Sequence, residues 1–329
     1  DIDFSNNAVN IVKAVGYVNN APIMAKGSIN KNIDVELLMN KVELNHLCPT
    51  TFGVKNGIAS LVANISGTLD NITHKENLQI ENLKIVNKNA DLAVDSIKID
   101  TNKSNTAYIN NILCKTKETE PIKVPSLKLF IERDSIRVPE TSIFMPNSKF
   151  TLKTEVTNYN TNDLSFNTSV KGFINSKDIK ALKSYSARYP FKITFNGNKS
   201  IQNILSQILL ENTAVLDEPA IINFSSKIDK NTLKLEDLSI VSFNGTFSDD
   251  FKSNLKGQKR IIITGAVEDL KNPVMKNIRV FFPQQLNLKL YDTLAQIKGD
   301  LFINGKMNKP DIVGQLALQN LFNQSMQLS

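Results

Sequence analysis

A segment near the C-terminus alternates apolar and polar residues on both sides of a short turn, and no other feature constrains the fold as much. It reads IKGDLFING from Ile297, turns over 306–310 and continues as IVGQLAL to Leu318. Alternation with a period of two is typical of a β-strand with one apolar face. Looser copies lie at 261–273, 63–80 and 16–27. A chain of repeated hairpins adds strands in one direction and builds an extended surface. We therefore expect its function to use that long surface and not a single compact site.

Most other segments also predict strands with one apolar face. The intervening positions are mostly Lys, Asn, Ser, Thr, Asp or Gln, as at Lys192, Thr194 and Asn196. Antiparallel sheets with one face in water produce this alternation, whereas buried parallel strands have continuous apolar runs. The apolar positions that we predict to line one face, as a groove, are Leu61, Ala63, Ile65, Leu127, Leu129, Leu152, Val156, Phe166, Ile193, Phe195, Ile222, Phe224, Ile261, Ile263, Leu286, Leu288, Leu301, Ile303, Leu316 and Leu318.

The predicted fold class is therefore all-β, with an elongated, twisted and mostly antiparallel sheet. At about a dozen residues per strand and turn, the 329 residues give on the order of 25 strands. In one ladder such a sheet would be roughly 100 Å long, so it would have to twist, curl or split into two packed sheets. We expect one repeat-built segment over 1–329, and the polar stretch 115–124 is the best candidate for a subdivision.

Two stretches break the alternation and predict short helices. Residues 200–209 place apolar side chains at i, i+3, i+4, i+7 and i+8 after Ser200, a suitable N-cap. Residues 176–182 predict a shorter helix. We expect the first helix to pack over the sheet or to plug an apolar trough, with packing favoured. Turns are predicted at the Asn-Gly pairs 56–57, 196–197, 244–245 and 304–305 and at the Pro-containing pairs 272–273 and 309–310.

The chain is basic, with a net charge of +7, which raises the question of a nucleic-acid partner. Only five of the 39 basic residues are arginines, and they are scattered along the sequence. Proteins that read phosphates and base edges usually cluster arginine. We therefore expect no nucleic-acid binding and interpret the lysines as solvent-facing residues that also protect exposed strand edges.

The two cysteines, Cys48 and Cys114, have no CxxC spacing. Two small buried thiols are the favoured interpretation, and one disulfide in an oxidising compartment is the alternative. His46 is the only metal-ligand candidate near Cys48, so we expect no metal site.

No run of 18 or more apolar residues occurs, so the sequence predicts no membrane-spanning helix. The chain opens with Asp1 rather than with Met and a basic, apolar leader. We expect it to be a fragment of a longer protein, with any signal or anchor outside it.

The sequence gives no sign of catalysis or of a cofactor. Its two histidines, His46 and His74, sit in no nucleophile arrangement, and no GxSxG, HExxH, P-loop or dinucleotide-binding motif is present. Pairs of carboxylates such as Asp249 with Asp250 and Glu118 with Glu120 are interpreted as solvated loop residues. We expect a protein that is not an enzyme.

The repeat resembles that of the AsmA-like superfamily, the TamB, AsmA and YhdP types of bridge-like lipid transfer protein. The resemblance is clearest over Ile297 to Leu318, where the pattern is apolar-x-Gly-x-apolar-x-apolar-x-Gly, a turn with Pro, and apolar-x-Gly-x-apolar-x-apolar. The stretches 64–85 and 170–182 are also similar. The resemblance extends over most of the chain, but the sequence pattern of each single repeat has low specificity.

This resemblance implies a long, curled, taco-like sheet with an apolar inner trough, in a periplasmic protein anchored in the inner membrane of a diderm bacterium. It implies movement of phospholipid between inner and outer membranes, with acyl chains in the trough and headgroups in water. It carries no catalytic residues to this chain. The implied partners are acyl-chain lipids and membrane proteins at the two ends of the full-length protein.

Alternation alone does not separate an open trough from a closed core. The first alternative is a structural or adhesive β-sandwich of the cell envelope, whose apolar faces would pack against each other. The second is an enzyme or carbohydrate-binding β-solenoid, against which the absence of Trp argues, since sugar platforms rely on exposed aromatic side chains.

Overall fold

The computed structural model describes residues 2–5, 8–68, 70–101, 105–184, 187–211, 219–290 and 293–323. For Ser5, Thr50, 284–290, 293–295 and 319–323 only the backbone is described. The fold is all-β, with strands that are antiparallel throughout, as the sequence predicts. The chain forms two compact units. Unit 1 comprises Asp1–Pro146 with Ile179–Ala181, and unit 2 comprises Asn147–Asp178 with Leu182–Ser329.

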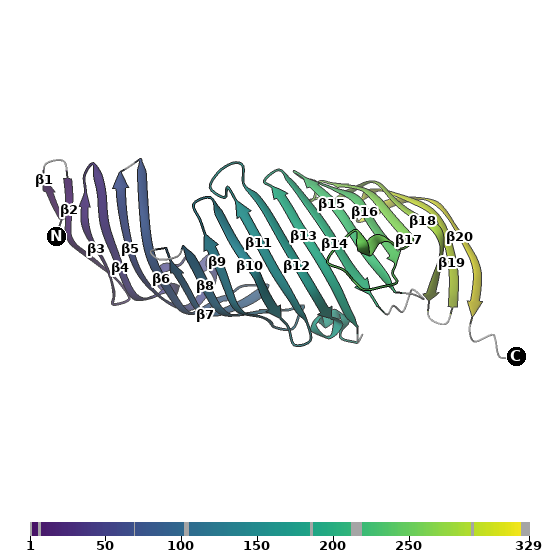
Figure 1. Ribbon diagram of the computed structural model, residues 1–329, viewed down its shortest axis with the longest axis horizontal. Coiled ribbons are helices and arrows are strands. Elements are labelled where there is room, and N and C mark those ends of the chain that lie inside the picture. The colour runs from purple at the N-terminus through teal and green to yellow at the C-terminus, as the bar shows by residue number, and fades with distance from the viewer. Residues whose placement is uncertain are drawn as a thin grey trace. The chain divides into compact units, whose positions relative to one another are not determined.

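The described residues of unit 1 form ten strands and one α-helical turn, coloured purple to teal in Figure 1. Each strand pairs with the next along the chain. The elements are β1 Ile2–Ser5, β2 Ala8–Val18, β3 Ala21–Ile29, β4 Asn32–Glu43, α1 Leu44–Leu47, η1 Thr50–Phe52, β5 Val54–Thr68, β6 Asn71–Val86, β7 Ala90–Asp100, β8 Thr106–Thr116, β9 Ile122–Ile131, β10 Ser135–Phe144 and η3 Lys180–Leu182, which ends one residue into unit 2.

Unit 2 repeats this up-and-down arrangement, with ten further strands in the part of it that the structure describes, teal to yellow in Figure 1. Neighbouring strands again pair in chain order. The elements are β11 Lys149–Thr157, β12 Ser165–Asn175, η2 Ser176–Asp178, β13 Arg188–Asn198, β14 Ile201–Leu210, β15 Ala220–Asp229, β16 Thr232–Ser242, η4 Ser253–Leu255, β17 Lys259–Glu268, β18 Val274–Leu290, β19 Thr293–Lys306 and β20 Lys309–Asn323.

The predicted helix over 200–209 is wrong, because these residues form β14. Ile204 and Ile208 face one side of the strand, while Leu205 and Leu209 face the other. Leu209 is buried although it lies on the otherwise polar side. A strand covered on both sides loses its period of two, and its apolar residues then also match a helical pattern. The shorter helix predicted at 176–182 is present as the two helical turns η2 and η3.

The Asn-Gly pairs mark turns less well than predicted. The pairs 56–57, 196–197 and 304–305 lie inside β5, β13 and β19, and only 244–245 lies in a loop. At Gly197 the reason is close approach, since a Cβ there would come within 2.2 Å of the Ile201 carbonyl oxygen. The two-residue connection between β2 and β3 instead uses Asn19 and Asn20, both with positive φ, as a turn of the I′ kind requires.

The described strands number 20 rather than about 25 because several are longer than the sequence pattern suggests. The 115–124 stretch holds the end of β8, the connection 117–121 and the start of β9, all inside unit 1, and the first division between the two units falls after Pro146.

A shared irregularity crosses β6 to β8 of unit 1. Asn82 and Asn111 adopt the left-handed conformation, with φ of 51° and 53°, and Asp95 lies between them and accepts a 2.9 Å hydrogen bond from Asn111. Asparagine tolerates this conformation better than most residues. At these asparagines the distance along the chain between successive apolar residues increases from two residues to three, as from Ile80 to Leu83 and from Ile109 to Ile112. The same face therefore stays apolar on both sides of them.

Candidate functional site

Strand pairing in unit 1 aligns apolar residues into rows that run across the sheet. Residues that are direct partners in a ladder project to the same face. One row contains Ile23, Met39, Leu61, Leu78, Ile99, Ala107 and Leu129, contributed by the seven consecutive strands β3 to β9. A second contains Ala59, Ile80, Ile97, Ile109 and Leu127. Together they form one continuous apolar face, the unit 1 face.

Unit 2 has an equivalent face, the unit 2 face. One row contains Leu152, Val170, Ile193, Ser206, Phe224, Leu238, Ile263, Val280 and Leu301. A parallel row contains Phe150, Gly172, Phe191, Ile208, Ile222, Ile240 and Ile261. Phe166 and Phe195 stack with ring centroids 4.7 Å apart. Few polar groups interrupt the face, Ser206 and the hydrogen-bonded pair Thr154 and Thr168 among them.

The pairing places the predicted groove residues on these two faces. Leu61, Ala63, Ile65, Leu127 and Leu129 lie on the unit 1 face. Those on the unit 2 face are Leu152, Val156, Phe166, Ile193, Phe195, Ile222, Phe224, Ile261, Ile263, Leu301, Ile303, Leu316 and Leu318. The side chains of Leu286 and Leu288 lie outside the described residues. Whether any of these side chains contacts a ligand remains a prediction.

Sequence reasoning missed part of both faces. Leu78, Ile80, Ile97 and Ile109 belong to the unit 1 face, and Leu238 belongs to the unit 2 face. The first group was hidden because the spacing of three residues at Asn82 and Asn111 interrupts the alternation. The β-branched content of these segments is the signal that would have found them.

Most side chains on both faces are half-buried rather than fully buried, including Ile193, Phe224 and Leu129. In a closed sandwich, the central residues of both inner faces would be sealed from solvent. The chain exposes 20615 Å². A compact monomer of 36.7 kDa would expose roughly 13,500 Å², and two compact bodies of half that mass about 16,300 Å². The surface is therefore larger than closed cores would leave.

The opposite face of unit 2 is polar and partly covered by residues 243–258, which we call the strap. The strap connects β16 to β17 and includes the helical turn η4, seen over the sheet in Figure 1. Beneath it, Leu209, Ile221 and Val241 are almost completely buried. The strap therefore gives unit 2 a small second core on the face away from its apolar rows.

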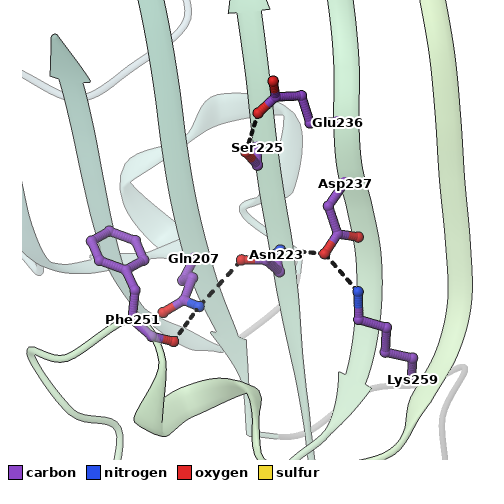
Figure 2. Close-up of polar contacts among 7 residues, drawn as sticks. All are labelled: Gln207, Asn223, Ser225, Glu236, Asp237, Phe251 and Lys259. Atoms are coloured by element: carbon purple, nitrogen blue, oxygen red, sulfur yellow. Dashed lines mark hydrogen bonds and ion pairs between the residues drawn. The ribbon is translucent and has the colours of Figure 1, made fainter.

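A chain of polar side chains links the strap to the sheet (Figure 2). The amide of Gln207 donates to the Phe251 carbonyl at 3.0 Å and to the Asn223 side chain at 3.2 Å. Asn223 in turn donates to Asp237, which also receives the Lys259 ammonium at 2.7 Å. Gln207 is completely buried. Because each buried amide finds a partner, the network fixes the strap without leaving these groups unpaired.

Exposed contacts hold the outer edge of the strap. Lys171 pairs with Asp249 at 3.0 Å, and the Lys192 ammonium lies 4.4 Å from the centre of the Phe251 ring. The hydrogen bond from the Ser253 hydroxyl to Asp250 lowers the pKa of that carboxyl below its usual value. Asp249 and Asp250 are thus structural residues of a loop, in agreement with the interpretation of this pair from the sequence.

The outer face of unit 1 holds a basic and aromatic cluster. The Lys128 ammonium lies 4.4 Å from the Phe130 ring centre and 5.3 Å from that of Tyr108, and Arg137 covers Phe130 from the next strand. The hydrogen bond to Lys128 lowers the pKa of the Tyr108 phenol. These contacts organise the polar surface of the sheet.

Residues with potential for chemistry are dispersed. Cys48 and Cys114 are free thiols. The side-chain amide of Asn19 donates a 2.7 Å hydrogen bond to Nε2 of His46, which lies 3.1 Å from Glu43, whereas His74 is exposed on β6. Within the described ranges, no group of three or more His, Cys, Asp or Glu side chains is arranged to hold a metal ion.

None of the helices in the described part of the chain has the length and apolar character needed to cross a bilayer. Comparison with protein-family models, with curated proteins and with solved structures gives no match for this chain.

Proposed function

We propose that the two apolar faces bind the acyl chains of phospholipids, and that the chain is a segment of a lipid-conducting bridge of the AsmA-like kind. The single observation that carries this proposal is the continuity of the apolar rows, which cross at least seven consecutive strands in each unit and stay half-buried. A soluble protein rarely leaves such a large apolar surface bare unless something binds there.

The chemistry of the faces suits a mobile lipid. An acyl chain laid on them gains roughly 25 cal/mol for each Å² of apolar surface removed from water. Ile, Leu, Val and Phe side chains offer dispersion contacts without direction, so one position along a row binds about as well as the next. The apolar rows themselves contain few polar groups, and Glu76 and His74 lie beside them, opposite Ala63 and Ile65. Along the rows, no single point holds a lipid much more strongly than its neighbours.

In this proposal the headgroups stay in water and only the tails enter the apolar faces. The full-length protein would lie in the periplasm and carry phospholipid between the inner and outer membranes of a diderm bacterium. Its partners would be phospholipids and the membrane proteins at its two ends. The chain contributes binding and positioning and performs no covalent chemistry.

The test is native mass spectrometry with lipid extraction on the purified chain and three variants. Ile193→Asp and Phe224→Asp place a carboxylate on the unit 2 face, and Thr194→Asp places one on the opposite face of the same strand as Ile193. We expect wild type and Thr194→Asp to carry several phospholipids and the other two to carry at least fivefold less, because an ionised carboxylate in an apolar site is strongly unfavourable.

Circular dichroism shows whether each variant is folded. Folded Ile193→Asp and Phe224→Asp variants with normal lipid content would overturn the proposal. A lipid-free wild type that refuses lipid from vesicles, together with unfolding of both variants, would instead support the closed-core envelope protein.

A further inference from the structure

Three connections of unit 1 lie at the same ends of its strands. In an up-and-down antiparallel sheet, alternate connections emerge on one side, so the β2–β3, β4–β5 and β6–β7 connections are neighbours. Two hydrogen bonds join them: Asn19 to His46 at 2.7 Å, and the Val86 amide to the Gly53 carbonyl at 2.9 Å. We call residues 17–20, 44–53 and 86–89 the loop rim.

The loop rim exposes large apolar side chains at its tips. Tyr17 is 71% exposed, Phe52 63% and Leu47 39%. Phe52 and Leu47 lie in the ten-residue connection that holds α1 and η1, away from the ladder of the sheet. Exposed aromatic and aliphatic side chains on neighbouring loops are typical of a surface that inserts into the interfacial layer of a bilayer.

The same connection reaches the unit 1 face. A Cβ at Gly57 would contact the side chains of Leu44 and Leu83 at 3.0 and 3.3 Å, so these two leucines lie against the same glycine. Leu83 pairs with Val94 at the end of the apolar face. The loop rim therefore meets the apolar face where Leu44 and Leu83 lie against Gly57.

The three connections of the loop rim are basic, whereas the next connection on the same side, β8–β9, contains Lys117, Glu118 and Glu120. The strand ends and turns at 41–55 and 84–91 contain Lys41, Lys55, Lys84 and Lys88, against Glu43 and Asp91. All four lysines are exposed, and Glu43 lies against His46. Anionic headgroups attract lysines that come within a Debye length of the bilayer.

We propose that the loop rim of unit 1 docks on an anionic bilayer, with Phe52 and Leu47 inserted among the headgroups, and that acyl chains pass from there over Leu44 onto the apolar face. This inference rests on the proposed function and names the place where lipid is loaded. Insertion supplies apolar burial, the lysines supply attraction to the anionic surface, and Leu44 supplies a continuous path for the tail.

The experiment is flotation of the whole chain with vesicles of phosphatidylcholine alone or with about one third phosphatidylglycerol. We expect wild type to bind the anionic vesicles, and Phe52→Asp combined with Leu47→Asp to lower the partition coefficient at least tenfold. Lys55→Glu and Lys88→Glu should each lower binding to the anionic vesicles by roughly fivefold or more and leave the weak binding to neutral vesicles unchanged.

Val62→Asp is the matched control, because Val62 is an exposed apolar residue of the same unit that lies on β5 outside the loop rim. It should bind vesicles like wild type. Equal loss of binding in Val62→Asp and in the Phe52 and Leu47 variant would overturn the inference, as would wild type that fails to float. Native mass spectrometry separates this inference from the proposed function. Protein that carries lipid but does not bind vesicles would contradict the loading site at the loop rim, while the proposal that the apolar faces bind lipid would stand.

Discussion

Among single residues, Asp178 is the clearest case of a polar side chain that the fold requires. It is completely buried in unit 2. Its carboxylate accepts hydrogen bonds from the Asn147 amide at 2.9 Å, from the Asn147 side chain at 2.8 Å and from the Ser148 hydroxyl. Asp178 thereby fastens η2 to the residues that precede β11.

Replacing Asp178 with Ala should destabilise unit 2 by about 2–4 kcal/mol, because the buried Ser148 hydroxyl would lose its acceptor and the exposed Asn147 would lose its hydrogen bonds to the carboxylate. Urea unfolding followed by circular dichroism measures the change. Asp229→Ala, at an exposed strand end, is the control and should change the free energy of unfolding by less than about 0.5 kcal/mol. Equal stability of the two variants would contradict the structural role of Asp178.

At the scale of the strand, glycines mark points where neighbouring backbones come too close for a side chain. Gly172 in β12 has φ of 152°, and a Cβ there would come within 2.4 Å of both the Lys149 carbonyl oxygen and the Phe150 Cα. The obstacle is backbone, which cannot rotate away. Gly57, Gly197 and Gly305 also belong to strands, so the turns predicted at these three Asn-Gly pairs are wrong.

Gly172→Ala should weaken the β11–β12 ladder and destabilise unit 2 by about 2–3 kcal/mol, through steric overlap and an unfavourable φ. Gly16→Ala is the matched control, because a Cβ at Gly16 meets nothing within 4 Å. Hydrogen exchange of the β11 amides should accelerate in the first variant only. Unchanged exchange in Gly172→Ala would show that the two strands can move apart without loss of pairing.

For the molecule as a whole, the large accessible surface is consistent with apolar rows that are only half-buried. The chain exposes more surface than two compact bodies of its total mass would, and the apolar rows form one face of each unit. Stability therefore comes mainly from contacts between neighbours within each sheet and less from a sealed interior. The strap over Leu209, Ile221 and Val241 is the exception.

This arrangement predicts that the lipid-free, fully folded protein binds the apolar dye ANS and that added phospholipid displaces the dye. ANS reports accessible apolar surface, which folded proteins with closed cores do not offer. The measurement is dye fluorescence at native pH, with near-ultraviolet circular dichroism to verify that tertiary packing is intact. A folded, lipid-free protein that does not bind ANS would contradict the interpretation that the apolar faces are open to solvent.

The sequence by itself determined the fold class and which side chains share a face. Alternation with a period of two is a local property, so Leu61, Ile193 or Leu301 could be assigned to an apolar face without knowledge of their partners. Where the alternation was broken, the prediction failed. The tertiary structure alone decided that residues 201–210 form a strand, because Gln207 on its polar side is held by the Phe251 carbonyl of the strap, which comes from residues 243–258, far along the chain. It also decided that the spacing of three at Asn82 and Asn111 continues one face, because only the pairing of β6, β7 and β8 places these irregularities side by side. Contacts between distant segments set both outcomes, and no local pattern contains them.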